Sequence, residues 1–162
     1  MGSNDFVNWG NTGRSEVDGI GLGESTDSLY IRKPGHPIAT GFAAGKLQVY
    51  NGYHSLTFGI PSADADVIAS ADADGKVPVL FVYDKGDKLA DGSVAPNKRI
   101  GLFLGQAANP TANYALPYEF LNDAGRKLLL NTIDYAIGKT AVADPTISIA
   151  RSGSNVVVTY AG

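Results

Sequence analysis

The most informative segment of the chain is Val77–Tyr83, which reads Val-Pro-Val-Leu-Phe-Val-Tyr. It carries no charge, and an unbroken apolar run of this length is typical of a strand covered on both faces, as in parallel α/β sheets. Pro78 must stand at the beginning of the strand, because proline has no backbone N–H to donate to a ladder. The segment therefore predicts a buried, parallel-type strand within a layered fold.

Shorter segments on either side extend the predicted sheet. Ser28–Arg32, Asp66–Ser70 and Arg99–Leu104 each combine apolar residues with flanking turn residues, a pattern that indicates strands. A further strand pair is predicted around Asn51-Gly52, because this dipeptide suits the two positive-φ positions of a type I′ turn. The implied hairpin joins Lys46–Tyr50 to Tyr53–Phe58 and pairs Leu47 with Leu56 and Val49 with His54.

One amphipathic helix is predicted over Asp123–Ile137. Asn122 can cap its first turn, and Gly138 provides a C-terminal stop. The spacing i, i+4, i+7 and i+8 predicts a buried apolar stripe, formed by Leu129, Ile133, Ala136 and Ile137. Strands combined with this helix indicate an α/β domain.

The chain after this helix has a different character. Residues 141–145 are expected to be a linker between an α/β domain at 1–140 and a truncated β module at 146–162. Thr146–Ala150 and Asn155–Tyr160 are β-patterned, so we expect a C-terminal β-hairpin.

Composition excludes several classes of protein. The 162 residues contain no cysteine, which excludes disulfides, thiolate nucleophiles and cysteine-based zinc sites. The net charge of −3, without clustered basic residues, argues against nucleic-acid binding. No apolar run is long enough to span a bilayer and no signal peptide begins the chain, so we expect a soluble protein. Gly19–Gly23 lacks the G-x-G-x-x-G spacing and a preceding strand, so no nucleotide cofactor is expected.

Residues 28–138 resemble the C-terminal portion of ThuA-like domains of the class I glutamine-amidotransferase-like type, which occur in large secreted bacterial proteins. The residues that carry the resemblance are Gly35–Phe42 (GHPIATGF), Val77–Gly86, Arg99–Leu104 and Asn122–Asn131 (NDAGRKLLLN). The tail from Pro145 to Tyr160 resembles the opening of the β module that often follows such domains.

The resemblance implies an α/β fold with a partial flavodoxin-like layered sheet and a C-terminal β-hairpin tail. It also implies a secreted or periplasmic parent protein. Amidotransferase members use a nucleophilic cysteine, which this chain lacks, so we do not expect a glutamine amidotransferase. A partial sheet leaves an open strand edge and an uncovered apolar face, from which we expect a homo-oligomer.

Acidic residues are concentrated in glycine-containing loops. Asp72, Asp74, Asp84 and Asp87 lie before and after the apolar strand, and closely spaced carboxylates can supply the oxygen ligands that Ca²⁺ requires. The simpler interpretation is that these aspartates form turns in which side chains bond their own backbone. The sequence leaves both interpretations open.

His36 and His54 are the candidate catalytic bases. With a bound calcium ion that polarises a carbonyl, either histidine could activate water for attack on an ester or lactone, such as an acyl-homoserine lactone. Each also has a structural interpretation: His54 lies on an apolar face, and His36 lies in a Gly-His-Pro turn. The leading hypothesis is a calcium-dependent hydrolase of a small uncharged substrate. The alternative is a non-catalytic binding or structural domain with a carbohydrate or a partner chain as ligand.

Overall fold

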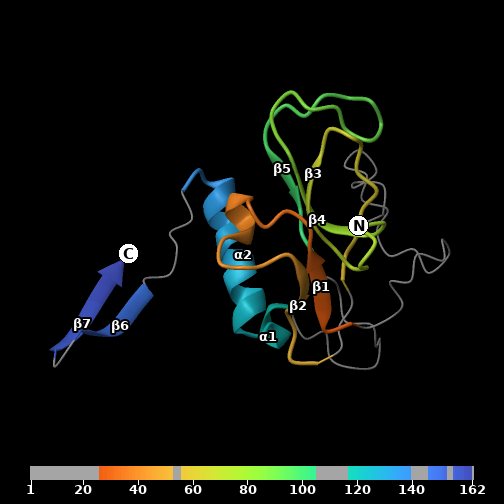
Figure 1. Ribbon diagram of the computed structural model, residues 1–162. Helices are drawn as coiled ribbons and strands as arrows, with labels where there is room; N and C mark the ends of the chain where they lie inside the picture. The colour runs from red at the N-terminus through yellow and green to blue at the C-terminus, as the bar shows by residue number, and fades with distance from the viewer. Residues whose placement is uncertain (1–25, 53–55, 105–116, 140–145, 153–154, 162) are drawn as a thin grey trace.

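The computed structural model describes residues 26–52, 56–104, 117–139, 146–152 and 155–161. Within these ranges the chain forms a five-stranded sheet with two helices, and a separate two-stranded sheet (Figure 1). The larger sheet consists of β1 (Ser28–Ile31), β2 (Gly45–Gln48), β3 (Asp66–Ser70), β4 (Pro78–Tyr83) and β5 (Arg99–Gly101). The helices are α1 (Pro117–Phe120) and α2 (Asp123–Ala136), and the fold is of the α/β type.

The strand order of this sheet is β2-β1-β3-β4-β5, and every pairing is antiparallel. The prediction of parallel-type strands is therefore wrong for the described sheet. The connection between β3 and β4, residues 71–77, is too short for a crossover helix and therefore requires these two strands to be antiparallel. The ladder between β3 and β4 is irregular, with register shifts between Val67 and Ala69 and between Ala69 and Ser70.

β4 is buried along its whole length and starts at Pro78, as the sequence predicted. Alternate residues of a strand point to opposite faces, and here the two faces meet different apolar clusters. Leu80 and Val82 join the main core, whereas Phe81 and Tyr83 pack with Leu89 and Ala95 of the following loop. The unbroken apolar run thus reflects an antiparallel strand covered by a core on one side and a folded loop on the other.

The predicted hairpin around Asn51-Gly52 has a different pairing in the structure. Leu47 pairs with Leu29 of β1, and Leu56 forms a bridge with Leu104. Val49 is buried and its carbonyl accepts a hydrogen bond from the backbone N–H of Asn122, at the start of α2. The predicted pairing of Leu47 with Leu56 is wrong, because each of these residues pairs with a different segment. The predicted pairing of Val49 with His54 involves a residue outside the described ranges.

α2 begins at Asp123 as predicted and ends at Ala136, one residue before the predicted end, with Ile137 as its C-cap. The Asn122 side chain accepts a hydrogen bond from the Gly125 N–H over 2.8 Å, and Gly138 has a φ of 77°, which terminates the helix. The buried face, however, consists of Gly125, Leu128, Leu129 and Thr132. The predicted stripe is wrong beyond Leu129, because Ile133 and Ile137 are 46% and 62% exposed.

Gly125 explains why the helix is rotated relative to that prediction. A Cβ at this position would lie 2.2 Å from the carbonyl oxygen of Val49 and 2.7 Å from Cδ2 of Leu121. Only glycine allows α2 to approach the chain so closely. The first turn of α2 therefore packs directly against Val49, which follows β2, and Leu128 faces the core.

The C-terminal strands β6 (Thr146–Ser152) and β7 (Asn155–Ala161) pair antiparallel along their whole length, which confirms the predicted β-hairpin. No helix in the described ranges is both long and apolar enough to cross a membrane.

Candidate functional site

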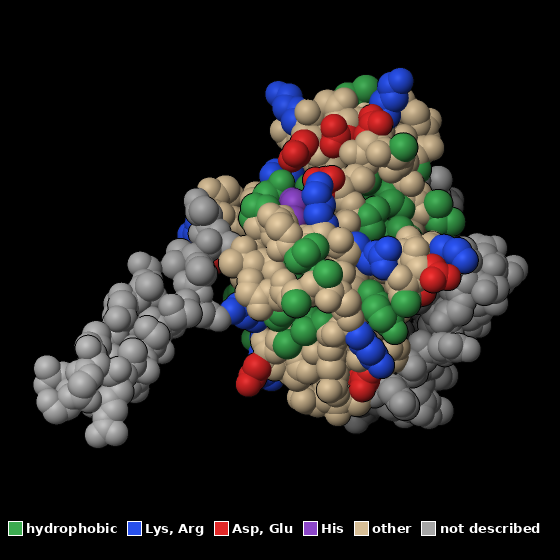
Figure 2. All heavy atoms as spheres, viewed as in Figure 1, with side chains coloured by type: hydrophobic (Ala, Val, Ile, Leu, Met, Phe, Trp, Pro, Cys, Tyr) green, Lys and Arg blue, Asp and Glu red, His purple; other side chains and the backbone are tan. Residues whose placement is uncertain are grey.

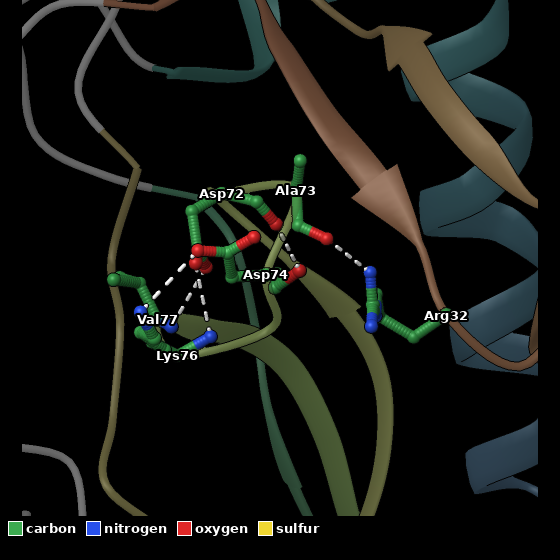
Figure 3. A network of polar contacts seen from close by, with 7 residues as sticks. Arg32, Asp72, Ala73, Asp74, Lys76 and Val77 are labelled. Atoms are coloured by element: carbon green, nitrogen blue, oxygen red, sulfur yellow. Dashed lines mark hydrogen bonds and ion pairs between the residues drawn. The ribbon is translucent and has the colours of Figure 1, made fainter.

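The first acidic loop lies between β3 and β4, where Asp72 organises the turn (Figure 3). One oxygen of its carboxylate accepts the backbone N–H of Val77 over 2.9 Å, and the other accepts the backbone N–H of Lys76 over 3.0 Å. The hydroxyl of Ser70 donates to the Asp72 carbonyl over 2.7 Å. Gly75, with a φ of 80°, supplies the left-handed conformation that closes the turn.

These hydrogen bonds also set the charge of Asp72. Partial burial alone would raise the pKa of its carboxyl group, but the backbone N–H groups of Lys76 and Val77 hold the pKa below its ordinary value. Asp74, in the same turn, is exposed and pairs with the Lys76 ammonium over 3.3 Å. Arg32, at the end of β1, donates to the carbonyl of Ala73 and so ties the turn to the sheet (Figure 3).

The second acidic loop follows β4. The Asp87 carboxylate accepts the backbone N–H of Asp84 over 2.6 Å, and the Asp87 N–H donates to the Asp84 carbonyl over 3.2 Å. The Asp84 carboxylate forms an ion pair with Lys98 over 3.2 Å. On the face in view in Figure 2, acidic side chains of the upper loops are flanked by lysine and arginine side chains.

The four aspartates predicted as calcium ligands form two separate pairs. Asp72 and Asp74 precede β4, whereas Asp84 and Asp87 follow it. A six-residue strand rises about 3.3 Å per residue, so the two turns are roughly 20 Å apart. They cannot share one ion. Within the described ranges, no three His, Asp or Glu side chains are grouped as a metal site requires.

His36 lies in the loop between β1 and β2, immediately before the short 3-10 helix η2 (Pro37–Ala39). Its Nδ1 accepts the backbone N–H of Ile38 over 3.2 Å, which makes His36 the N-cap of η2 and requires Nδ1 to be unprotonated. His36 is only 7% exposed, and its ring meets the ring of Tyr135 edge-on at 4.7 Å.

Burial lowers the pKa of His36, and the neighbouring charges largely oppose one another. Asp66 and Asp84 raise the pKa, while Lys33 and Lys98 lower it. The net effect lowers the pKa and so favours the neutral imidazole, the form that the N-cap hydrogen bond requires.

Lys98 connects His36 to the second acidic loop. Its Nζ lies 3.6 Å from the centre of the Tyr135 ring and also pairs with Asp84. Burial alone would lower the pKa of Lys98, but its contacts with Tyr135 and Asp84 raise it overall. We call His36, Asp84, Lys98 and Tyr135 the His36 cluster. Of the residues that the sequence singled out, only His36 and Asp84 meet there, and His54 lies outside the described residues.

The sequence did not indicate the roles of Lys98, Tyr135 and Asn131. The side-chain amide of Asn131 donates to the carbonyls of Ile38 and Thr40, each over 3.0 Å, and so holds η2 against α2. Two of the segments quoted for the resemblance, Gly35–Phe42 and Asn122–Asn131, thus meet through Asn131.

A second feature absent from the prediction is the outward face of α2. Leu130, Ile133 and the C-cap residue Ile137 are 60%, 46% and 62% exposed and follow one another at i, i+3 and i+7. We call these three residues the α2 outer face. Their spacing was visible in the sequence, but which apolar positions face inward was decided by Gly125.

Comparisons of the chain with protein-family models, with curated proteins and with solved structures find no match.

Proposed function

We propose that this chain is a non-catalytic interaction domain, which uses the α2 outer face to contact another protein surface. The observation that carries the proposal is the exposure of Leu130, Ile133 and Ile137 on a helix whose opposite side is buried. Contiguous apolar surface that faces water is a usual mark of a protein contact site. Scattered apolar residues would not carry this argument, but these three form one stripe on a well-formed helix.

The acidic loops support a structural rather than a catalytic role. Both oxygens of Asp72 accept backbone N–H groups, and Asp87 accepts the backbone N–H of Asp84. Asp91 likewise accepts the Ser93 N–H of its own loop over 2.9 Å, while Asp64, before β3, accepts the Lys88 N–H of the loop after β4 over 2.9 Å. Carboxylates that bond their own loops in this way are the usual device for fixing turns.

The His36 cluster supports the same conclusion. Nδ1 of His36 is engaged as an N-cap, and the Asp84 carboxylate is neutralised by Lys98. A calcium-dependent hydrolase of esters or lactones remains the competing hypothesis, with His36 as base and Asp84 and Asp87 as ligands. It would require Lys98 to leave Asp84, because an ammonium group and a divalent cation compete for the same carboxylate.

We also propose kinship with ThuA-like domains, a flavodoxin-like ancestry of the layered sheet and an exported parent protein. Their support is the set of residues quoted above, together with the packing of Gly35–Phe42 on α2 through Asn131. Kinship of fold does not fix function. A carbohydrate is the alternative ligand, for which the exposed ring of Tyr118, 5.8 Å from the Arg126 guanidinium, is the candidate stacking surface.

One set of assays separates these alternatives. The chain is tested against lactones and p-nitrophenyl esters with added calcium and with EGTA, and against a panel of saccharides by calorimetry. We expect no turnover, no saccharide heat and the same melting temperature with and without calcium. Calcium-dependent turnover that is lost in His36→Asn would replace the proposal with the hydrolase hypothesis. Saccharide binding that is lost in Tyr118→Ala would replace it with carbohydrate recognition.

A further inference from the structure

We infer that the partner of the α2 outer face is the same face of a second copy of this chain, with the two helices antiparallel. This inference rests on the proposed function and specifies its partner.

The spacing of the stripe is suited to self-association. Arg126, Leu130, Ile133 and Ile137 follow at intervals of four, three and four residues, which is the a/d spacing of a helix–helix seam. The order of intervals is the same in both directions. In a two-fold contact, residue i meets j while j meets i. An antiparallel pair therefore places Leu130 opposite the partner copy's Ile133, and the aliphatic part of Arg126 opposite its Ile137.

The charges at the ends of the stripe permit this arrangement. Asp123 and Arg126 lie 3.9 Å apart at the beginning of α2, and Asp134 and Lys139 lie 3.7 Å apart at its end. Each end thus carries one acid and one base. When the helices run antiparallel, the Asp123–Arg126 pair of one copy lies beside the Asp134–Lys139 pair of the other. Acid and base can then also pair between the copies, without net repulsion. The opposed helix dipoles also attract, whereas a parallel pair would bring like ends together.

The size of the surface sets the expected strength. Three aliphatic side chains that each expose about half of their surface provide only a small apolar centre, so we expect an interface below about 1,200 Å² in total, the range of weak and transient contacts. Such interfaces are reversible. We therefore expect monomers in dilute solution and dimers as the concentration rises from about 10 μM to about 1 mM.

Sedimentation velocity across this range provides the first test. Wild type and Val94→Glu should show the same concentration-dependent rise in sedimentation coefficient, since Val94 is 59% exposed but lies in the loop between β4 and β5. Ile133→Glu, which places a carboxylate beside the two-fold axis, should remain monomeric. Circular dichroism and the melting temperature establish that each variant is folded. A wild type that stays monomeric throughout, or an Ile133→Glu variant that associates like wild type, would overturn the inference.

Disulfide trapping tests the antiparallel orientation of the two helices. Because the chain has no native cysteine, only the introduced cysteines can form disulfides. Arg126→Cys and Ile137→Cys are oxidised separately and as a mixture. In the antiparallel pair the two different positions meet, while each is about 16 Å from its own copy along the helix axis, too far for a disulfide. Rapid formation of the mixed disulfide is expected. Cross-linking only between identical positions would indicate a parallel pair and refute the proposed arrangement.

The outcomes of this test and of the functional assays are separable. A monomeric chain without hydrolase or saccharide activity would refute self-association but leave an interaction domain with a different partner. Calcium-dependent turnover would refute the interaction domain even if the chain dimerised.

Discussion

The side-chain amide of Asn131 donates to the backbone carbonyl of Ile38 over 3.0 Å, and thereby connects α2 to η2 across 93 positions of sequence. The same amide reaches the carbonyl of Thr40. Its two N–H donors thus satisfy two carbonyls of one loop at once. This loop carries His36, so Asn131 also holds the His36 ring beside Tyr135 of α2.

Replacement of Asn131 should loosen this connection. Asn131→Asp keeps the shape of the side chain but replaces two donors with a carboxylate that faces two carbonyls. We expect the free energy of unfolding to fall by about 2–3 kcal/mol, because two acceptors lose their partners next to a like partial charge. Urea denaturation at low protein concentration measures the change.

Leu130→Gln, next to Asn131 but exposed, is the matched control and should change stability by no more than about 0.5 kcal/mol under the same dilute conditions. Equal stability of the two variants would mean that Asn131 does not hold η2.

Gly125→Ala tests the close approach of α2. Alanine normally favours a helix over glycine by about 1 kcal/mol, yet here its Cβ would lie 2.2 Å from the Val49 oxygen. We expect a net loss of at least about 2 kcal/mol, since backbone cannot move as easily as a flexible side chain. Thermal unfolding provides the measurement. Gly35→Ala, at a position with no atom within 4 Å of the added Cβ, should remain close to wild type.

Asp72 should contribute to stability through its turn. Asp72→Ala removes two acceptors from the N–H groups of Lys76 and Val77, and we expect a loss of about 1–2 kcal/mol. Asp74→Ala breaks only an exposed ion pair and should cost less than about 0.5 kcal/mol. Chemical denaturation of both variants distinguishes them, and an equal effect would contradict the assigned role of the Asp72 carboxylate.

His36 should make stability depend on pH. Its pKa in the folded chain lies below the ordinary value of 6.5, chiefly because of burial. The neutral form is therefore favoured by folding, and its contribution is complete above about pH 6.5 and is lost as the pH falls through the lower folded pKa. Protonation of Nδ1 would also remove the acceptor for the Ile38 N–H.

His36→Asn retains an N-cap acceptor but does not titrate. Between pH 7 and pH 5, unfolding should show a smaller decrease in stability for this variant than for wild type. Identical profiles would show that His36 does not govern the decrease. The charged neighbours that remain in both proteins are Lys33, Asp66, Asp84 and Lys98.

Local patterns in the sequence predicted most of the elements. The start of β4 at Pro78, the Asn122 cap of α2 and the C-terminal hairpin are all confirmed, because each depends on residues that lie close together in the chain. The direction of the strands was not predictable in this way. An apolar run such as Val79–Tyr83 shows that both faces are covered, but not whether helices or a loop with Leu89 cover them.

The candidate site was less predictable, for a related reason. Gly125 adds nothing to a hydrophobic pattern, yet its missing side chain decides which side of α2 is buried. The aspartates suggested a metal because the sequence shows their spacing but not their hydrogen-bond donors, and the donors to Asp72 are the amides of its own turn. Tyr135 meets His36, and Lys98 meets Tyr135, only through tertiary packing.

The most direct measurement of the central claim is a series of methyl NMR spectra recorded from about 10 μM to about 1 mM. If the α2 outer face pairs with a second copy, the methyl signals of Leu130, Ile133 and Ile137 should shift or broaden as the concentration rises. Those of Ile60 and Val94, which are equally exposed elsewhere, should stay unchanged. Spectra in which the three α2 signals do not change with concentration would contradict the account.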